Sequence, residues 1–195
     1  MTIPAPTAHA RERDALRHEQ VVLVDQEDRE VGTTSKLQAH RRGQLHRAVS
    51  VLVCDSKGAF LLQRRALQKY HSPGLWSNSC CGHPRPGEAT LAAASRRLRE
   101  EMGVDCPLEF ALAFSYRAAL GRGMTEHEID HVFVGECDDA PSPDPLEVSE
   151  WRRVEPGVLQ REMRATPELF TVWFHVLMER LAFRNASAPC KLVST

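Results

Sequence analysis

Two neighbouring stretches of the chain combine residue types that suit chemistry. The first, NSCCGHP at 78–84, places Cys80 and Cys81 side by side and follows them, across one glycine, with His83. Because alternate side chains of an extended segment share one face, Cys81 and His83 should point together while Cys80 turns into packing. The pattern therefore predicts different environments for two adjacent thiols.

The second stretch, TLAAASRRLREEMGV at 90–104, has the composition of a helix, with Thr90 as its N-cap and Gly103 at its end. Arg97 and Glu101 lie one helical turn apart on one face. A carboxylate on such a face can hold Mg²⁺ that substrate phosphate oxygens complete, and a guanidinium can clamp phosphate. The plainer interpretation is a solvated helix with ordinary Arg/Glu pairs.

Strands dominate the elements that must position these two stretches. They are predicted at 19–25, 45–55, 59–66, 108–118, 128–137 and 147–154. The second and third of them are joined by the turn-forming DSKG and should form a hairpin. The polar stretch 26–32 is predicted as a turn, 35–40 as a short helical turn and 168–183 as a helix. This order predicts an α/β (α+β) class, with a mixed sheet between helices.

Length and charge limit the organisation and the partners. A chain of 195 residues with 42% hydrophobic content can bury one core, and its formal net charge of -1 gives no case for nucleic acid or an anionic membrane. We expect one domain over 19–184, a flexible N-terminal arm over 1–18 and a flexible tail over 185–195. A small-molecule partner and a monomer or weak homodimer are expected.

The cysteines and the N-terminus indicate the compartment. Six cysteines show no paired spacing, and a domain of this size needs no disulfide, so we expect all six to be thiols. No apolar run is long enough to span a membrane, and the first residues lack the apolar core of a signal peptide. We therefore expect a cytoplasmic protein.

Gly82 of the first stretch and the helix of the second lie in one longer register that resembles a Nudix box. The positions that fit are Gly82, Glu88, Arg96, Leu98, Glu100, Glu101, Gly103 and Val104. Arg97 departs from the pattern, because hydrolases of this family carry Glu there. Exchanging one Glu for Arg should weaken a metal cluster built for hydrolysis and add a phosphate clamp.

Together with the box, NSCCGHP resembles the cysteine motif of the type I isopentenyl diphosphate isomerases, and the resemblance covers about residues 19 to 184. It implies a Nudix fold with an added N-terminal strand and C-terminal helix. It also implies that Cys81 is the active thiol, while Cys80 fills space. The activity implied is the conversion of isopentenyl diphosphate to dimethylallyl diphosphate in isoprenoid biosynthesis.

The same resemblance implies two metal sites. Three histidines and two carboxylates would bind Mn²⁺ or Zn²⁺, a set of mixed hard and borderline donors: His40, His46, His83, Glu126 and Glu128. Mg²⁺ would be bound with the substrate diphosphate through Glu101 and the main-chain oxygen of Cys81. The other histidines, His71 among them, are expected to be ordinary surface or core residues.

The resemblance also implies how substrate is bound and converted. The cations that would neutralise a diphosphate are Lys36, Arg65, Lys69 and Arg97. Glu128, acting with Tyr116, would supply one proton, and Cys81 as a thiolate would take the other. Trp173 would face the carbocation through its ring, although packing between helix and sheet is the simpler role for an aromatic residue there.

Two alternatives come from other classes of function. The first is a Nudix pyrophosphatase acting on a nucleoside diphosphate derivative, which Arg97 and the cysteine motif oppose. The second is a catalytically silent Nudix module that binds a ligand or a protein, which requires Cys81 or Glu128 to be lost or misplaced. Both residues are present at the expected positions.

Overall fold

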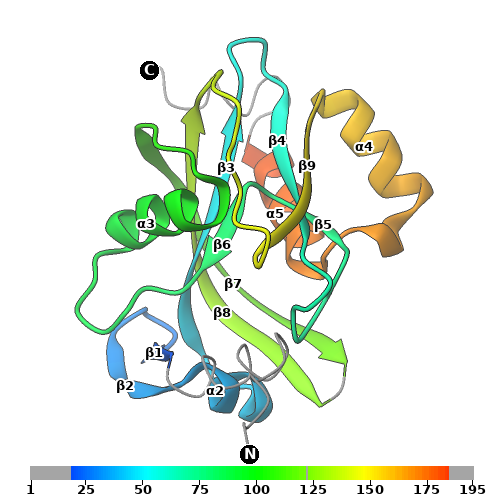
Figure 1. Ribbon diagram of the computed structural model, residues 1–195. Helices are drawn as coiled ribbons and strands as arrows, with labels where there is room; N and C mark the ends of the chain where they lie inside the picture. Colours follow the sequence, from blue (N-terminus) through cyan, green and yellow to red (C-terminus); the bar gives the residue numbers. More distant parts are fainter. Residues whose placement is uncertain (1–18, 122, 185–195) are drawn as a thin grey trace, which may run out of the picture.

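The computed structural model describes residues 19–121 and 123–184. The arm expected over 1–18 and the tail expected over 185–195 lie outside the described residues. Within them, one mixed sheet is covered by helices on both faces (Figure 1). The predicted fold class, a mixed sheet between helices, is therefore confirmed.

The sheet has nine strands in the described part of the chain, and β3 (His46–Cys54) lies at its centre. This strand pairs in parallel with β8 (Met124–Glu136) along its whole length and antiparallel with β6 (Cys80–Gly82) near its middle. The remaining strands are β1 (Gln20–Val24), β2 (Glu30–Ser35), β4 (Phe60–Arg65), β5 (Trp76–Ser77), β7 (Leu108–Gly121) and β9 (Val148–Val154). The cysteine motif is thus hydrogen-bonded to the central strand.

Helices lie on the two faces of this sheet. The helix α3 (Thr90–Met102) covers one face, and α5 (Val172–Arg184) lies across the other, as Figure 1 shows. Also present are α2 (Lys36–Arg42), α4 (Pro156–Ala165) and the short 3-10 helix η1 (Pro167–Leu169). Among the described helices, none is long and apolar enough to cross a bilayer.

The core is divided into two layers because β3 is buried on both faces. Val51 and Val53 pack towards Leu98 of α3, whereas Leu52, between them in sequence, packs towards Phe174 of α5. All three β3 residues have no exposed surface. A strand covered on both sides loses the alternation of polar and apolar residues, which explains the continuous apolar run in this segment.

Two local predictions were wrong, and one helix was not predicted. The strand β2 begins at Glu30, inside the stretch predicted as a turn, because it is an edge strand of largely polar residues that pairs only with β1. The helix α4 was missed. Thr90 is the first helical residue rather than the N-cap, a position held by Ala89 without a side-chain hydrogen bond. Gly103 ends the helix as predicted, and the structure shows it in the left-handed conformation.

Cysteine chemistry also departs from expectation at one position. Cys80, Cys81, Cys106 and Cys137 are free thiols. Cys54, at the end of β3, is in a disulfide, so the expectation of six thiols is wrong. Spacing along the sequence did not reveal this bond, because the fold and not the spacing decides which cysteines meet.

Candidate active site

A cavity at the middle of the sheet gathers nearly all of the residues singled out from the sequence. It is bounded by β3, β6, β8, α3 and the first turn of α5. The predicted residues that line it are Lys36, Arg65, Lys69, Cys81, His83, Arg97, Glu101, Tyr116, Glu126, Glu128 and Trp173. His40 and His46 do not line it, because both are fully buried behind its wall.

Four of the five predicted metal ligands form one cluster. His46 begins β3 and is paired across the sheet with Glu128 of β8, while α2 brings His40 and the end of β6 brings His83. One ligand atom from each of these four residues lies within 4.8 Å of the others. The fifth, Glu126, lies one strand repeat from Glu128, and its Oε2 is 2.9 Å from His40 Nε2.

The chemistry of this cluster fits a divalent metal ion. His40 Nε2 and Glu126 Oε2 are buried and face each other, and neither has a hydrogen-bond partner among the residues that the structure describes. Meanwhile His40 Nδ1 contacts the Tyr70 hydroxyl at 3.0 Å and His46 Nδ1 contacts the Gln44 carbonyl at 2.8 Å, which leaves Nε2 of each ring for a metal.

Protonation of two of the three imidazoles agrees with that use, whereas the pKa of His46 is raised, because burial lowers it but the Glu128 carboxylate outweighs burial. Burial lowers the pKa of His40 and of His83 to about 3, so both rings are neutral, which is the form that binds metal. Burial and the adjacent Glu128 raise the pKa of Glu126 well above its ordinary value. A cation between these groups would remove the repulsion between the two carboxylates.

Glu128 joins the cluster to the cavity. Its Oε1 contacts His83 Nε2 at 3.0 Å, and its Oε2 accepts a hydrogen bond of 2.6 Å from the Tyr116 hydroxyl. Burial raises the pKa of Glu128, but the contacts with His46 and His83 lower it by more. The pKa of Glu128 is therefore well below its ordinary value. Burial raises the pKa of Tyr116 well above its ordinary value, so this hydroxyl keeps its proton.

The two adjacent cysteines have different environments. Cys80 is fully buried in the layer under α3. Cys81 lines the cavity, with its Sγ 3.1 Å from Asn78 Oδ1 and 3.6 Å from Ser50 Oγ. Burial raises the pKa of Cys81 to about 12, so the described state is a thiol, where a thiolate was expected. The carboxyl of Asp130, bonded to the same Ser50, is also buried near this thiol.

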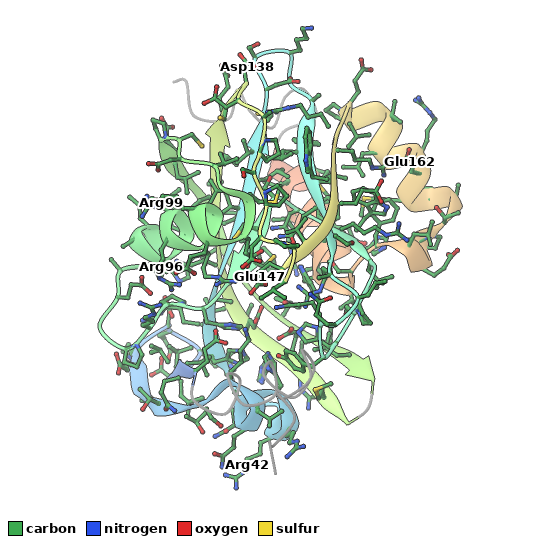
Figure 2. All side chains as sticks on the ribbon, viewed as in Figure 1. Arg42, Arg96, Arg99, Asp138, Glu147 and Glu162 are labelled. Atoms are coloured by element: carbon green, nitrogen blue, oxygen red, sulfur yellow. The ribbon has the colours of Figure 1, made fainter. Side chains whose placement is uncertain are left out.

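The four predicted cations are held by carboxylates or by ring stacking. Lys36 pairs with Glu19 at 3.2 Å, Lys69 pairs with Glu147 at 2.7 Å, and Arg97 pairs with Glu101. Figure 2 shows Glu147 near the middle of the molecule, between α3 and β9.

The remaining cation, Arg65, stacks 5.1 Å from the centre of the Trp173 ring. Arg65 thus contacts the aromatic wall of the cavity.

Gly82 and Glu88, both in the Nudix-like register, have structural roles. A Cβ at Gly82 would lie 2.8 Å from Cγ of Arg97, so only glycine lets the arginine stem pass. Glu88 instead pairs with Arg96 at 2.7 Å and ties the loop before α3 to the helix. The Nudix-like register therefore shapes the wall of the cavity and the course of Arg97 across it.

Several residues of the cavity were missed by sequence reasoning. His71, expected to be ordinary, is buried against the Trp173 ring at 5.5 Å and lies 3.9 Å from Glu126. Its place in the short loop that follows Arg65 and contains Lys69 was the signal that could have found it. Glu147 had no such signal, because it comes from a distant loop.

Comparisons with known proteins give a family match and named relatives. A family model described as NUDIX domain matches residues 44–174. A curated protein of Aromatoleum aromaticum, named isopentenyl-diphosphate Delta-isomerase 2, is 50% identical over 84% of this chain and 86% of its own length. A Serratia proteamaculans protein named isopentenyl-diphosphate Delta-isomerase is 49% identical over 91% of this chain and 99% of its own.

Solved structures resemble the fold at lower sequence identity. A Deinococcus radiodurans protein superposes with a TM-score of 0.71, at 23% identity, over 83% of this chain and 98% of its own. A MutT protein from Methanosarcina mazei gives a TM-score of 0.59 at 22% identity, over 72% and 95%. At this identity the likeness speaks for the fold alone.

Proposed function

The chain belongs to the Nudix family and, within it, to the isopentenyl-diphosphate Delta-isomerases, and on that premise we propose how its cavity moves the double bond. The protein is an isomerase that converts isopentenyl diphosphate to dimethylallyl diphosphate. The reaction adds a proton at one carbon and removes a proton two carbons away, and needs no redox cofactor. The observation that carries the proposal is the presence of Cys81 and the Tyr116–Glu128 pair in one cavity.

We propose that the diphosphate is bound at the side of the cavity formed by Lys36, Lys69 and Arg97. These cations lie together with Arg65 among the lining residues, and the carboxylates that now hold them keep their side chains in place. Glu101 and the main-chain oxygen of Cys81 would hold a Mg²⁺ that neutralises phosphate charge. Gln63 donates a hydrogen bond of 2.7 Å to Glu101 and so orients it.

A second divalent cation belongs to the histidine cluster. The donor set supports metal binding there, and Mn²⁺ or Zn²⁺ is our proposal for its identity, with His40, His46, His83, Glu126 and Glu128 as ligands. Such an ion would stabilise the charged form of Glu128 and fix its position.

Proton transfer is assigned to the chain's own groups. Tyr116 holds a proton 2.6 Å from Glu128, and these two residues deliver it to the terminal carbon of the alkene. Cys81 accepts the proton released from the other carbon. Because Cys81 is a thiol in the described state, it must first lose its proton to solvent, and only the resulting thiolate can take the proton from the substrate carbon.

The cation formed by protonating an alkene must be kept from water. Trp173 is buried, and its ring and the ring of His71 lie 5.5 Å apart at the cavity. An electron-rich indole face stabilises a nearby cation by about 2 kcal/mol when it is desolvated. We therefore assign to Trp173 both the exclusion of water and the stabilisation of the carbocation.

The remaining assignments follow from the same function. We propose a cytoplasmic enzyme of isoprenoid biosynthesis, active as a monomer or weak homodimer, with no nucleic-acid or membrane partner. Its catalytic domain extends over 19–184, and the proposed arm and tail are the segments on either side. The small-molecule substrate accounts for the residues gathered in the cavity, among them the four cations.

One experiment separates this function from pyrophosphate hydrolysis. The purified protein is incubated with Mg²⁺ and Mn²⁺ and with either isopentenyl diphosphate or a panel of nucleoside diphosphate derivatives. We expect dimethylallyl diphosphate from the first and no phosphate release from the panel, because Arg97 replaces a metal-binding carboxylate in the helix. Phosphate release from a nucleotide together with unchanged isopentenyl diphosphate would refute the proposal.

A further inference from the structure

Two buried side chains that take no part in the proposed steps connect the aromatic wall of the cavity to its thiol. They are Ser77, at the end of β5, and Asn78, which follows it. We infer that Ser77 and Asn78 are positioning residues that fix the Cys81 sulfur and the Trp173 ring relative to each other. The inference rests on the proposed function, because it assigns these two residues to the step in which Cys81 accepts a proton.

The amide of Asn78 has only one orientation that satisfies its neighbours. Its Nδ2 donates to the carbonyl oxygens of Val51 at 3.0 Å and Cys80 at 2.7 Å. Since both of these partners can only accept, the nitrogen must face them. The Oδ1 of Asn78 is therefore directed towards Cys81, whose thiol donates to it over 3.1 Å. The direction of the S–H bond is set by a side chain that cannot turn.

Ser77 extends this connection to the helix α5. Its hydroxyl donates to Asn78 Oδ1 at 3.0 Å and accepts a hydrogen bond of 2.9 Å from Trp173 Nε1. The Thr171 hydroxyl, 3.1 Å away, is a further partner of the same oxygen. An indole nitrogen can only donate, so the order of donors along the path is fixed from Trp173 to Ser77 to Asn78.

The backbone reinforces this path. The amide of Thr171 donates to the Trp76 carbonyl at 2.9 Å, which fastens the start of α5 to β5. Ser77, Asn78 and Thr171 have at most 1% exposed surface, so water does not compete for these bonds. The indole and the thiol, more than 90 residues apart in sequence, are thereby held by one short chain of four residues.

Such a connection should affect turnover more than substrate binding. Misplacing a reacting group by about 1 Å can cost about 10²-fold in rate. Of the cations assigned to the diphosphate, Lys36, Lys69 and Arg97 pair with carboxylates outside the path, whereas Arg65 stacks on the Trp173 ring, 5.1 Å from its centre. Breaking the path should therefore lower kcat and leave KM for isopentenyl diphosphate nearly unchanged.

Ser79 offers a matched control for Ser77. It is equally buried, but its hydroxyl donates to the Leu61 carbonyl at 2.7 Å and accepts from the Val53 amide at 2.8 Å. Both of its bonds serve the backbone of the sheet. Ser77→Ala and Ser79→Ala thus each remove one buried, fully hydrogen-bonded hydroxyl, at positions two residues apart in the sequence.

The test measures kcat, KM and thermal stability for these two variants and the unmodified protein in one assay. We expect Ser77→Ala to lower kcat about tenfold or more with KM within about twofold, and Ser79→Ala to keep kcat within about twofold whatever its loss of stability. A folded Ser77→Ala with unchanged kcat, or an equal fall in Ser79→Ala, would overturn the inference. Absence of turnover in the unmodified protein would instead overturn the proposed function.

Two further variants keep the test decisive. Should Ser77→Ala not fold, Ser77→Cys keeps the volume but hydrogen-bonds weakly, so the same selective fall in kcat is expected and an unchanged kcat is contrary. Trp173→Phe removes the indole donor, and its effect on kcat should combine with that of Ser77→Ala less than additively, because both changes break one bond. Full additivity would show that the two residues act separately.

Discussion

The two adjacent cysteines allow a prediction in which activity and stability respond in opposite ways. Cys81→Ser replaces the sulfur that lines the cavity and faces Asn78 Oδ1 at 3.1 Å. Cys80→Ser makes the same chemical change one residue earlier, in a side chain with no exposed surface in the apolar layer under α3. The substitutions are chemically identical, so any difference between them reports on the two environments.

The expected magnitudes follow from these environments. A serine hydroxyl at 81 can donate to Asn78, so folding should be little affected, while loss of the proton acceptor should lower kcat by about 10²- to 10⁴-fold. At 80 the sulfur donates to the Cys81 carbonyl over 3.8 Å, a distance too long for a hydroxyl. A buried hydroxyl without a partner costs about 1–3 kcal/mol, or about 2–4 °C of Tm per kcal/mol.

The assay combines steady-state isomerisation kinetics with thermal unfolding of both variants. We predict an inactive Cys81→Ser with a Tm near that of the unmodified protein, and an active Cys80→Ser with a lowered Tm. Comparable loss of activity in the two folded variants would refute the division of roles between the thiols.

Further predictions concern the phosphate site, the thiol, the metal cluster and the glycine of the motif. Arg97→Glu should raise KM about tenfold or more without creating pyrophosphatase activity, since it removes a cation and places a carboxylate beside Glu101; phosphate release from nucleotides by this variant would contradict a dry cavity. Because burial raises the pKa of Cys81 to about 12, the thiolate fraction grows as pH rises, so kcat/KM should increase between about pH 7 and 9; a flat profile would indicate that Cys81 starts as the acid. Chelation should lower Tm and Mn²⁺ or Zn²⁺ should restore it, by about 2.7 kcal/mol at 100 times Kd, and His83→Ala should lose this response; a Tm indifferent to metal would argue against the cluster. Gly82→Ala should raise KM, because the new Cβ displaces the Arg97 stem, and an unchanged KM would show that this stem moves freely.

The sequence predicted the central part of the fold because local and long-range signals agreed there. The apolar runs of β3 and β8 and the end of α3 at Gly103 were all readable from composition and spacing. The edge strand β2 was not, since it is polar on both faces and its pairing with β1 is decided by the fold. The helix α4, which buries only Leu159 and Met163, gave a weak apolar pattern.

Within the candidate site, motif residues were predictable and their partners were not. Cys81 and His83 come from one short string, so their shared position in the cavity followed from strand geometry. Asn78, in the same string, has a task that appears only when Trp173 is brought to β5 from the end of the chain. The raised pKa of Cys81 likewise depends on burial, which a motif does not report.

Isotope incorporation tests the central claim most directly. Isopentenyl diphosphate is incubated with the purified protein, Mg²⁺ and Mn²⁺ in deuterated water, and the product is followed by NMR. If an acid and a base in one cavity transfer protons that exchange with solvent, we expect dimethylallyl diphosphate that carries deuterium at the newly formed methyl group. Product without deuterium would point to direct hydrogen transfer within the substrate, and unchanged substrate would contradict isomerisation by this site altogether.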